Sequence, residues 1–208
     1  MPRNRIPEAT IRRLPIYLRT LSDLVNDQVD VISSAELAEK TGFSSEQIRK
    51  DLAYFGAFGV RGVGYSTSHL SQCLRRILGL HKEVKAVLVG AGHLGTALAR
   101  YNITRHKDVR ITAIFDSDPQ KTGHNIEGVP IRPIQEMKET IKREGIKMGI
   151  IAVPAPEAQK VALELKEAGV EAILNFAPTK IVPPEGTFVQ NVDLTLELQS
   201  LAFYVNRE

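Results

Sequence analysis

The stretch VLVGAGHLG, residues 87–95, constrains the fold of this chain more than any other. An apolar run typical of a buried strand leads into three glycines in the pattern G-x-G-x-x-G, and a helical sequence follows them directly. In a βαβ unit, Gly90 permits the tight turn, Gly92 lets the backbone approach a pyrophosphate, and Gly95 lets the helix pack closely on the strand. We predict a dinucleotide-binding turn formed by Gly90, Ala91, Gly92, His93, Leu94 and Gly95. Within it, His93 either contacts a phosphate or points into solvent.

The second predicted strand, VRITAIFD at residues 109–116, ends in an acid. Asp116 follows Gly95 by 21 residues, near the spacing of about 20 at which a carboxylate bonds the ribose of NAD. Asp116 and Asp118 would repel the 2′-phosphate of NADP, and FDSDPQK contains no arginine to bind one. Further short apolar strands and helices alternate up to about residue 178, which predicts a parallel, doubly wound sheet. The sequence therefore favours NAD(H) as the ligand.

The residues before this unit predict a different kind of domain. Residues 33–55 form two short helical sequences, the first capped by Ser33 or Ser34 and ended by Gly42. The second is capped by Ser44, which we expect to form a capping box with Gln47. The glycine-rich stretch GAFGVRGVGY, residues 56–65, suits a hairpin. Two helices and a hairpin in this order predict a winged helix-turn-helix.

Charge supports DNA as the partner of this first part. Up to Lys85 the chain has 13 Lys+Arg against 9 Asp+Glu, whereas the remainder has 14 against 15. A solvated basic face is the simpler interpretation of charge alone, but a basic helix-turn-helix favours a double-stranded operator. Residues 11–25 have apolar side chains at three- and four-residue spacing and predict a further helix before these two. We predict phosphate contacts from this helix, base contacts along the helix that Ser44 caps, and a wing-tip arginine in the minor groove or on a phosphate. The predicted DNA-binding residues are Arg12, Arg13, Ser45, Gln47, Arg49, Lys50, Tyr54 and Arg61.

The sequence argues against an enzyme. The Rossmann-type unit runs almost to residue 208, so we expect no second, catalytic domain, and none of the histidines ends a strand beside the cofactor. His, Cys and acidic residues do not cluster at metal-ligand spacing, and Cys73 lies on the apolar side of a helix, which suggests a core position. No apolar run could span a bilayer and no signal peptide is visible, so we expect a cytoplasmic protein without a membrane partner.

The last helical sequence, VDLTLELQSLAFYV at residues 192–205, is apolar around much of its circumference. Such a helix needs a second surface to cover it. A second subunit is the expected cover, and a two-fold dimer would read an operator built as an inverted repeat.

Taken together, these motifs resemble Rex, the bacterial family of redox-sensing transcriptional repressors. The resemblance spans the whole chain and is carried by SSEQIRKDLAYFGAFGVRGVGY, VLVGAGHLG, AIFDSDP, IAVPA and NVDLTLELQSLAFY. It implies a winged-helix domain at residues 1–80, a Rossmann domain at 81–190 and a domain-swapped dimerisation helix at 191–208. It also implies a homodimer that NADH releases from operators of fermentation and respiration genes, while NAD+ permits binding.

The same resemblance assigns further residues by position. It implies that Tyr101 meets Asp193 of the partner subunit, whose C-terminal helix is swapped across the dimer. It places the nicotinamide beside Val153, Pro154 and Ala155. The loop NFAP at residues 175–178 follows a predicted strand, and from that position we expect it nearby. Two alternatives stay open: an NAD-dependent enzyme with a DNA-binding appendage, and a CoA-binding module, because CoA-binding domains share this type of Rossmann core.

Overall fold

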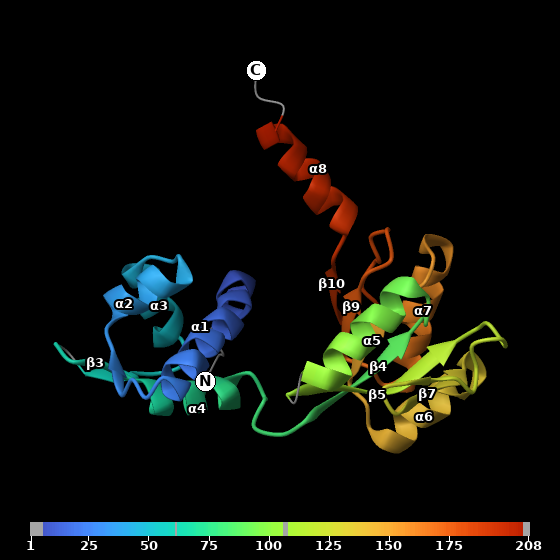
Figure 1. Ribbon diagram of the computed structural model, residues 1–208, viewed down its shortest axis with the longest axis horizontal. Coiled ribbons are helices and arrows are strands. Elements are labelled where there is room, and N and C mark those ends of the chain that lie inside the picture. The colour runs from blue at the N-terminus through green and yellow to red at the C-terminus, as the bar shows by residue number, and fades with distance from the viewer. Residues whose placement is uncertain (1–5, 61, 106–107, 206–208) are drawn as a thin grey trace. The chain divides into compact units, whose positions relative to one another are not determined.

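A computed structural model describes residues 6–60, 62–105 and 108–205. The chain divides into two compact units, Met1–Lys82 and Glu83–Glu208. The first is mainly helical, whereas the second is built on a parallel sheet (Figure 1). No helix within the described residues has the length and apolar character needed to cross a membrane. The expected combination of a helical N-terminal unit with a Rossmann-type unit is therefore confirmed.

The N-terminal unit packs its helices around one apolar core and a small antiparallel sheet of the order β1-β3-β2. Tyr17, Leu21, Leu37, Ile48 and Leu70 are all completely buried in this core. Its elements in chain order are α1 (Glu8–Asn26), β1 (Val31–Ile32), α2 (Ser34–Thr41), α3 (Ser45–Ala53), β2 (Gly59–Val60), β3 (Gly64–Ser66) and α4 (Thr67–Ile77).

Serine caps set the boundaries of the two central helices. The Ser33 side chain accepts from the N–H of Glu36, and the Glu36 carboxylate accepts from the N–H of Ser33, which makes a complete capping box for α2. Ser44 caps α3 by accepting from the N–H of Gln47. The predicted second half of this capping box was wrong, because the Gln47 side chain donates to Asp51 instead.

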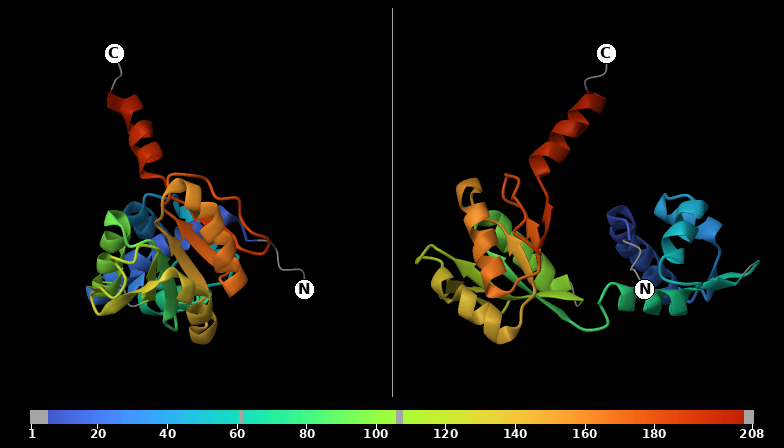
Figure 2. Two further views of the ribbon diagram at one scale, coloured as in Figure 1. Left: turned by 90° about the vertical axis from the view of Figure 1, so that its right-hand side faces the viewer. Right: turned by 180° about the vertical axis from the view of Figure 1, so that it is seen from behind.

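The C-terminal unit carries a sheet of the order β10-β9-β8-β4-β5-β7-β6, in which β6 alone among the described strands pairs antiparallel. Helices cover both of its faces (Figures 1 and 2). Its elements in chain order are β4 (Val84–Val89), α5 (His93–Arg105), β5 (Val109–Asp116), β6 (Asn125–Ile126), β7 (Val129–Pro133), the 3-10 turn η1 (Ile134–Glu136), α6 (Met137–Glu144), β8 (Met148–Ile151), α7 (Ala155–Ala168), β9 (Ala172–Asn175), β10 (Phe188–Asn191) and α8 (Leu194–Val205).

The period-two alternation of strand β4 builds a core on each side of the sheet. Val87 and Val89 point into the cluster beneath α6 and α7, while Ala86 and Leu88 point into the cluster beneath α5. Strands that are buried on both faces are continuously apolar, which is why these runs were visible in the sequence. Helix α8 contributes to neither of these two cores, because none of its described residues is buried on its own chain.

Candidate functional sites

A cavity of about 570 Å³ opens at the carboxyl ends of β4, β5 and β8. In a doubly wound sheet this edge is where nucleotides bind. The structure brings the Gly-rich turn, the acid at the end of β5 and the loop after β8 into this one cavity. Its lining includes the predicted residues Gly90, Gly92, Asp116, Val153 and Pro154.

The glycines of the turn are needed for different reasons. Gly90 has a φ of 101°, and a Cβ there would overlap the carbonyl oxygen of Ala152 at the end of the neighbouring strand. A Cβ on Gly95 would overlap the carbonyl oxygen of Gly90, so this glycine lets the start of α5 approach the turn. A Cβ on Gly92 would meet nothing within 4 Å. Gly92 therefore leaves open space on the cavity side, where a pyrophosphate would approach.

Asp116 connects the Gly-rich turn to the loop that follows β5. Its carboxylate accepts from the N–H of Ala91 at 2.7 Å and from the N–H of Asp118 at 2.8 Å, and the Lys121 ammonium lies 3.3 Å away. Burial alone would raise the pKa of Asp116, but the N–H groups of Asp118 and Ala91 and the charge of Lys121 outweigh it and lower the pKa. Asp116 is therefore ionised, and its bond to Ala91 fixes the Gly-rich turn to the end of β5.

The remaining predicted nucleotide residues lie around this centre. Ala91 is buried, whereas His93 and Leu94 are exposed in the first turn of α5, and Ala155 begins α7 half-buried. Sequence reasoning did not assign Lys121 or the polar residues of α7 that also line the cavity, Glu157, Lys160 and Glu164. The i, i+3 and i, i+7 spacing of these α7 residues marks one helix face, which is the signal that could have found them.

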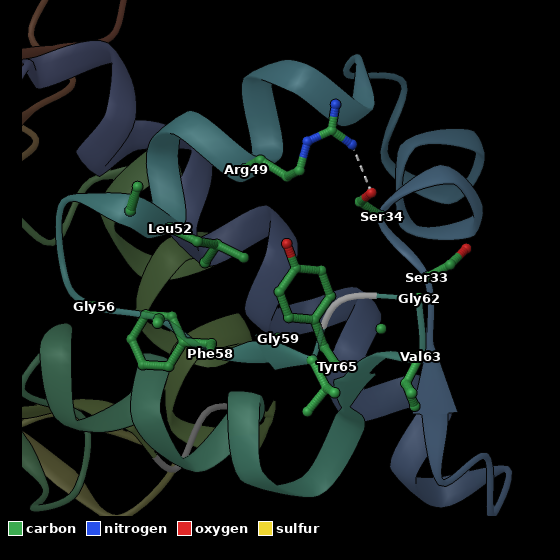
Figure 3. Close-up of a pocket in the computed structure, with 14 residues that line it drawn as sticks. Ser33, Ser34, Arg49, Leu52, Gly56, Phe58, Gly59, Gly62, Val63 and Tyr65 are labelled. Atoms are coloured by element: carbon green, nitrogen blue, oxygen red, sulfur yellow. Dashed lines mark hydrogen bonds between the residues drawn. The ribbon is translucent and has the colours of Figure 1, made fainter.

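The second candidate site is the helix-turn-helix of α2 and α3. Arg49 and Lys50 are exposed on α3, and Tyr54 at its C-terminal end is 45% exposed. Arg49 donates to the Ser34 hydroxyl at 2.9 Å, which holds its guanidinium over the start of α2 (Figure 3). Lys50 pairs with Glu46 on the same helix at 2.7 Å. Of their two partners, Glu46 is exposed and Ser34 is half-buried.

The wing is the antiparallel hairpin of β2 and β3. Together with α3 it lines a cavity of about 910 Å³, in which the Tyr65 ring lies between the wing and Arg49 (Figure 3). A Cβ on Gly59 would press against that ring at 2.8 Å, which explains a glycine in this strand. The predicted wing-tip residue, Arg61, lies outside the described residues.

The two predicted phosphate-binding arginines have different surroundings. Arg12 is exposed and pairs with Glu8 at 2.6 Å, one turn away on α1. Arg13 is half-buried, and its Nε and Nη2 both donate to the carboxylate of Asp51 on α3. Gln47, predicted to contact bases, donates to the same carboxylate, and Ser45 is half-buried in the first turn of α3. Asp51 was missed, because a single acid within a basic helix gives no signal of burial.

Tyr101 and Asp193 were predicted to pair across the dimer, and Cys73 was predicted to be a core residue. Tyr101 is 56% exposed, with the Arg105 guanidinium 5.8 Å from its ring centre, and Asp193 accepts from the N–H of Thr195 at the start of α8. Their pairing across two subunits stays a prediction. Cys73 was expected in the core, but it is only half-buried, with its Sγ 3.6 Å from Nε2 of His69.

Two protein-family models match these units. One, described as a CoA binding domain, matches residues 81–179, and the other, described as a putative DNA-binding protein N-terminus, matches residues 5–53. The chain is similar to solved structures of RSP, a Rex-family repressor. A complex of RSP with β-NAD+ and operator DNA is 38% identical, with a TM-score of 0.90 over 97% of this chain and 93% of that one. A complex with β-NADH is 36% identical, with a TM-score of 0.85 over 98% and 95%.

Curated relatives align with nearly the whole chain. A protein of Natranaerobius thermophilus is 48% identical over 99% of this chain and 94% of its own, and one of Brevibacillus brevis is 47% identical over 97% of each. Both carry the name redox-sensing transcriptional repressor Rex. Identity at this level across both units, together with the paired folds described above, shows that the chain belongs to the Rex family of redox-sensing transcriptional repressors.

Proposed function

We propose that this chain binds operator DNA through its N-terminal unit and NAD(H) in the cavity of its C-terminal unit, and that NADH releases it from DNA. The observation that carries the proposal is the single cavity that joins the Gly90–Gly95 turn, the ionised Asp116 and the loop after β8. The turn suits a pyrophosphate and the acid suits a ribose diol, while the loop at Val153 and Pro154 leaves room for the nicotinamide. Related structures hold NAD+ with operator DNA, and NADH.

On the DNA side, the proposal assigns the exposed residues of α3 to the major groove. Arg49 and Lys50 suit guanine or phosphate, and Ser45 and Tyr54 lie at the two ends of the same helix. Arg12 on α1 is placed to neutralise a phosphate, and Arg61 is assigned to the wing contact by sequence alone.

The proposal includes a homodimer that acts in the cytoplasm, where bacterial operators are found. Helix α8 supports the dimer, because Leu198, Phe203 and Val205 are at least 65% exposed on the single chain. A helix that is apolar around much of its circumference needs a partner surface. Two-fold symmetry would place the two α3 helices on the halves of an inverted repeat.

The match to a CoA-binding family model supports CoA as a second candidate ligand. CoA carries a 3′-phosphate on its ribose, next to the hydroxyl that Asp116 would bond. The ionised Asp116 repels that phosphate, although Lys121 lies within the same cavity. Competition between CoA and NADH in a fluorescence titration decides between them, and we expect CoA not to displace NADH at equal concentration.

The direct test is a gel shift of a palindromic operator with the purified full-length protein, titrated separately with NADH and NAD+. We expect NADH to release the DNA and NAD+ to leave the complex intact. Gly92→Ala is the matched control, because its Cβ fills only the cavity and should abolish the NADH response without impairing DNA binding. Equal effects of the two nucleotides, or turnover of NADH with a small carbonyl substrate, would contradict the proposal.

A further inference from the structure

Asp51 is an unusual residue for a helix that is meant to contact a polyanion. It lies on α3 between Lys50 and Leu52, yet its side chain is completely buried. A buried carboxylate is strongly destabilising unless it is paired and hydrogen-bonded. The residues around Asp51 therefore have to supply both charge and donors.

Helix α1 supplies them from one face. Thr10, Arg13 and Tyr17 follow the spacing i, i+3, i+7, which places them on the same side of a helix. The Thr10 hydroxyl donates to Oδ1 at 2.9 Å and the Tyr17 hydroxyl to Oδ2 at 2.8 Å. Arg13 binds both oxygens in a fork, at 2.6 Å from Nε and 2.8 Å from Nη2. This bidentate geometry fixes the orientation of the carboxylate as well as its position.

Two further contacts extend the network on the α3 side. Gln47, one turn before Asp51, donates to Oδ1 at 2.9 Å. Phe43, in the turn between α2 and α3, packs against the Tyr17 ring at 5.7 Å and lies 5.8 Å beneath the Arg13 guanidinium. The first helix is thus bonded to the middle of α3 and to the turn that precedes it.

The electrostatics agree with a permanent ion pair. Burial alone would raise the pKa of Asp51, but its bonds from Arg13, Tyr17, Thr10 and Gln47 outweigh burial and lower the pKa to about 2. The bond to Asp51 in turn raises the pKa of Arg13. Both partners are therefore charged at neutral pH.

We propose that Asp51 is a positioning residue for operator binding, which locks α3 to α1 so that Arg49 and Lys50 keep their orientation, and that Arg13 contributes through Asp51 instead of through a phosphate. This inference rests on the proposed role of α3 as the operator-reading helix. Arg49 and Lys50 directly precede Asp51 in α3, and they are exposed whereas Asp51 is buried against α1. A rotation of α3 about its axis would therefore move both away from the bases. Specific recognition suffers from such a rotation, whereas non-specific attraction of the charges does not.

The chain offers a matched pair of arginines to test this. Arg12 and Arg13 are neighbours on α1, but Arg12 pairs with exposed Glu8 and Arg13 with buried Asp51. The experiment measures the affinity of full-length Arg12→Gln, Arg13→Gln, Asp51→Asn and the double variant Arg13→Gln/Asp51→Asn for operator and for random DNA, over a range of salt concentrations. Arg49→Ala serves as the reference for loss of a direct contact, and wild-type binding to the operator tests the proposed function separately.

We expect Arg12→Gln to lower the salt slope by about one unit, as loss of a phosphate contact does. Arg13→Gln and Asp51→Asn should each reduce operator affinity by roughly tenfold with the slope and the random-DNA affinity unchanged. The double variant should bind no more weakly than the weaker single variant, because both changes break one interaction. Additive effects, a reduced slope for Arg13→Gln, or an equal loss on random DNA would overturn the proposal.

Folding is followed in the same samples through NADH affinity and thermal unfolding. Should Asp51→Asn unfold, Thr10→Val and Tyr17→Phe each remove one donor while keeping the volume of the side chain. A selective loss of operator affinity in these two variants supports the proposal. Unchanged discrimination between operator and random DNA in both of them overturns it.

Discussion

At the scale of single residues, two buried acids organise the two units. Asp116 and Asp51 are both 7% exposed or less, and each is stabilised as an anion by groups from another segment of the chain. Asp116 receives two backbone N–H groups besides the Lys121 ammonium, whereas the bonds to Asp51 come from side chains. This difference predicts different responses to substitution, because a backbone donor that loses its acceptor remains in place and unsatisfied.

We predict that Asp116→Ala destabilises the C-terminal unit as well as weakening NADH binding. The N–H groups of Ala91 and Asp118 lose their acceptor, at a cost of about 1–3 kcal/mol for a buried one. Asp116→Asn, which keeps one carbonyl oxygen, should fall between wild type and Asp116→Ala. Urea unfolding and NADH titration measure the two effects, and an Asp116→Ala protein of unchanged stability would show that the bonds to the turn are dispensable.

The pKa of Asp51 predicts how acid affects the N-terminal unit. Its folded pKa of about 2 lies below the ordinary 3.8, so ionised Asp51 stabilises the fold above pH 4. The contribution, roughly 2 kcal/mol, is lost as the pH falls from about 4 to about 2. Asp51→Asn should therefore flatten the decrease in stability over this window, as measured by urea unfolding between pH 2 and 5. An identical pH dependence in wild type and variant would contradict the assigned pKa.

At the scale of elements, Gly95 and Gly92 of the turn have different roles, the first in folding and the second in nucleotide binding. We predict that Gly95→Ala strongly destabilises the C-terminal unit, because its Cβ would overlap the carbonyl oxygen of Gly90. Gly92→Ala should leave the melting temperature nearly unchanged, because its Cβ meets no protein atom, but should weaken NADH binding by closing the approach of the pyrophosphate. Calorimetry with and without NADH compares them, and equal melting temperatures for the two variants would refute this division.

The same elements show what the sequence could predict. The buried strands β4, β5, β8 and β9 are continuous apolar runs between helices, and the cap Ser44 is a local signal, so the sequence predicts all of them. For α2 the sequence predicts a cap at Ser33 or Ser34, and the structure shows Ser33. Strands β1, β6, β7 and β10 were not predicted. They are short or partly exposed, and their pairing is set by neighbours distant in sequence, as when β10 joins β9 at the edge of the sheet. The Asp51 network was unpredictable for the same reason, since Thr10 and Asp51 are 41 residues apart.

At the scale of the whole molecule, the exposed helix α8 predicts the assembly. Its leucines and aromatic residues have no buried position on the single chain. We predict that deletion from Val192 onward gives a monomeric or aggregating protein with poor operator affinity, because one subunit can then read only half of an inverted repeat. Sedimentation and gel shift measure these effects. A truncated protein that remains dimeric would show that another surface forms the interface.

Release by NADH requires that the redox state of the bound nucleotide changes the affinity for operator DNA. NAD+ and NADH share their phosphates and riboses, so the Gly90–Gly95 turn and Asp116 should bind both. A ligand shifts an equilibrium only by its differential affinity for two states, so the groups that discriminate must lie near the nicotinamide and connect the subunits. The family resemblance assigns this to Tyr101 and to Asp193 of the partner subunit. Tyr101 lies exposed on α5, and Asp193 is half-buried directly before α8.

We therefore predict that Tyr101→Phe and Asp193→Ala keep NADH binding but blunt the release from DNA. Asp193 also accepts from the N–H groups of Thr195 and Leu196, so Asp193→Ala removes a helix cap as well. Asp193→Asn keeps the cap without the charge and separates the two effects. Operator affinity with and without saturating NADH is the measurement, for which couplings of about 1–3 kcal/mol, or roughly 5–150-fold, are typical. A wild-type ratio in Tyr101→Phe and Asp193→Asn would place the switch elsewhere, because neither variant removes the cap of α8.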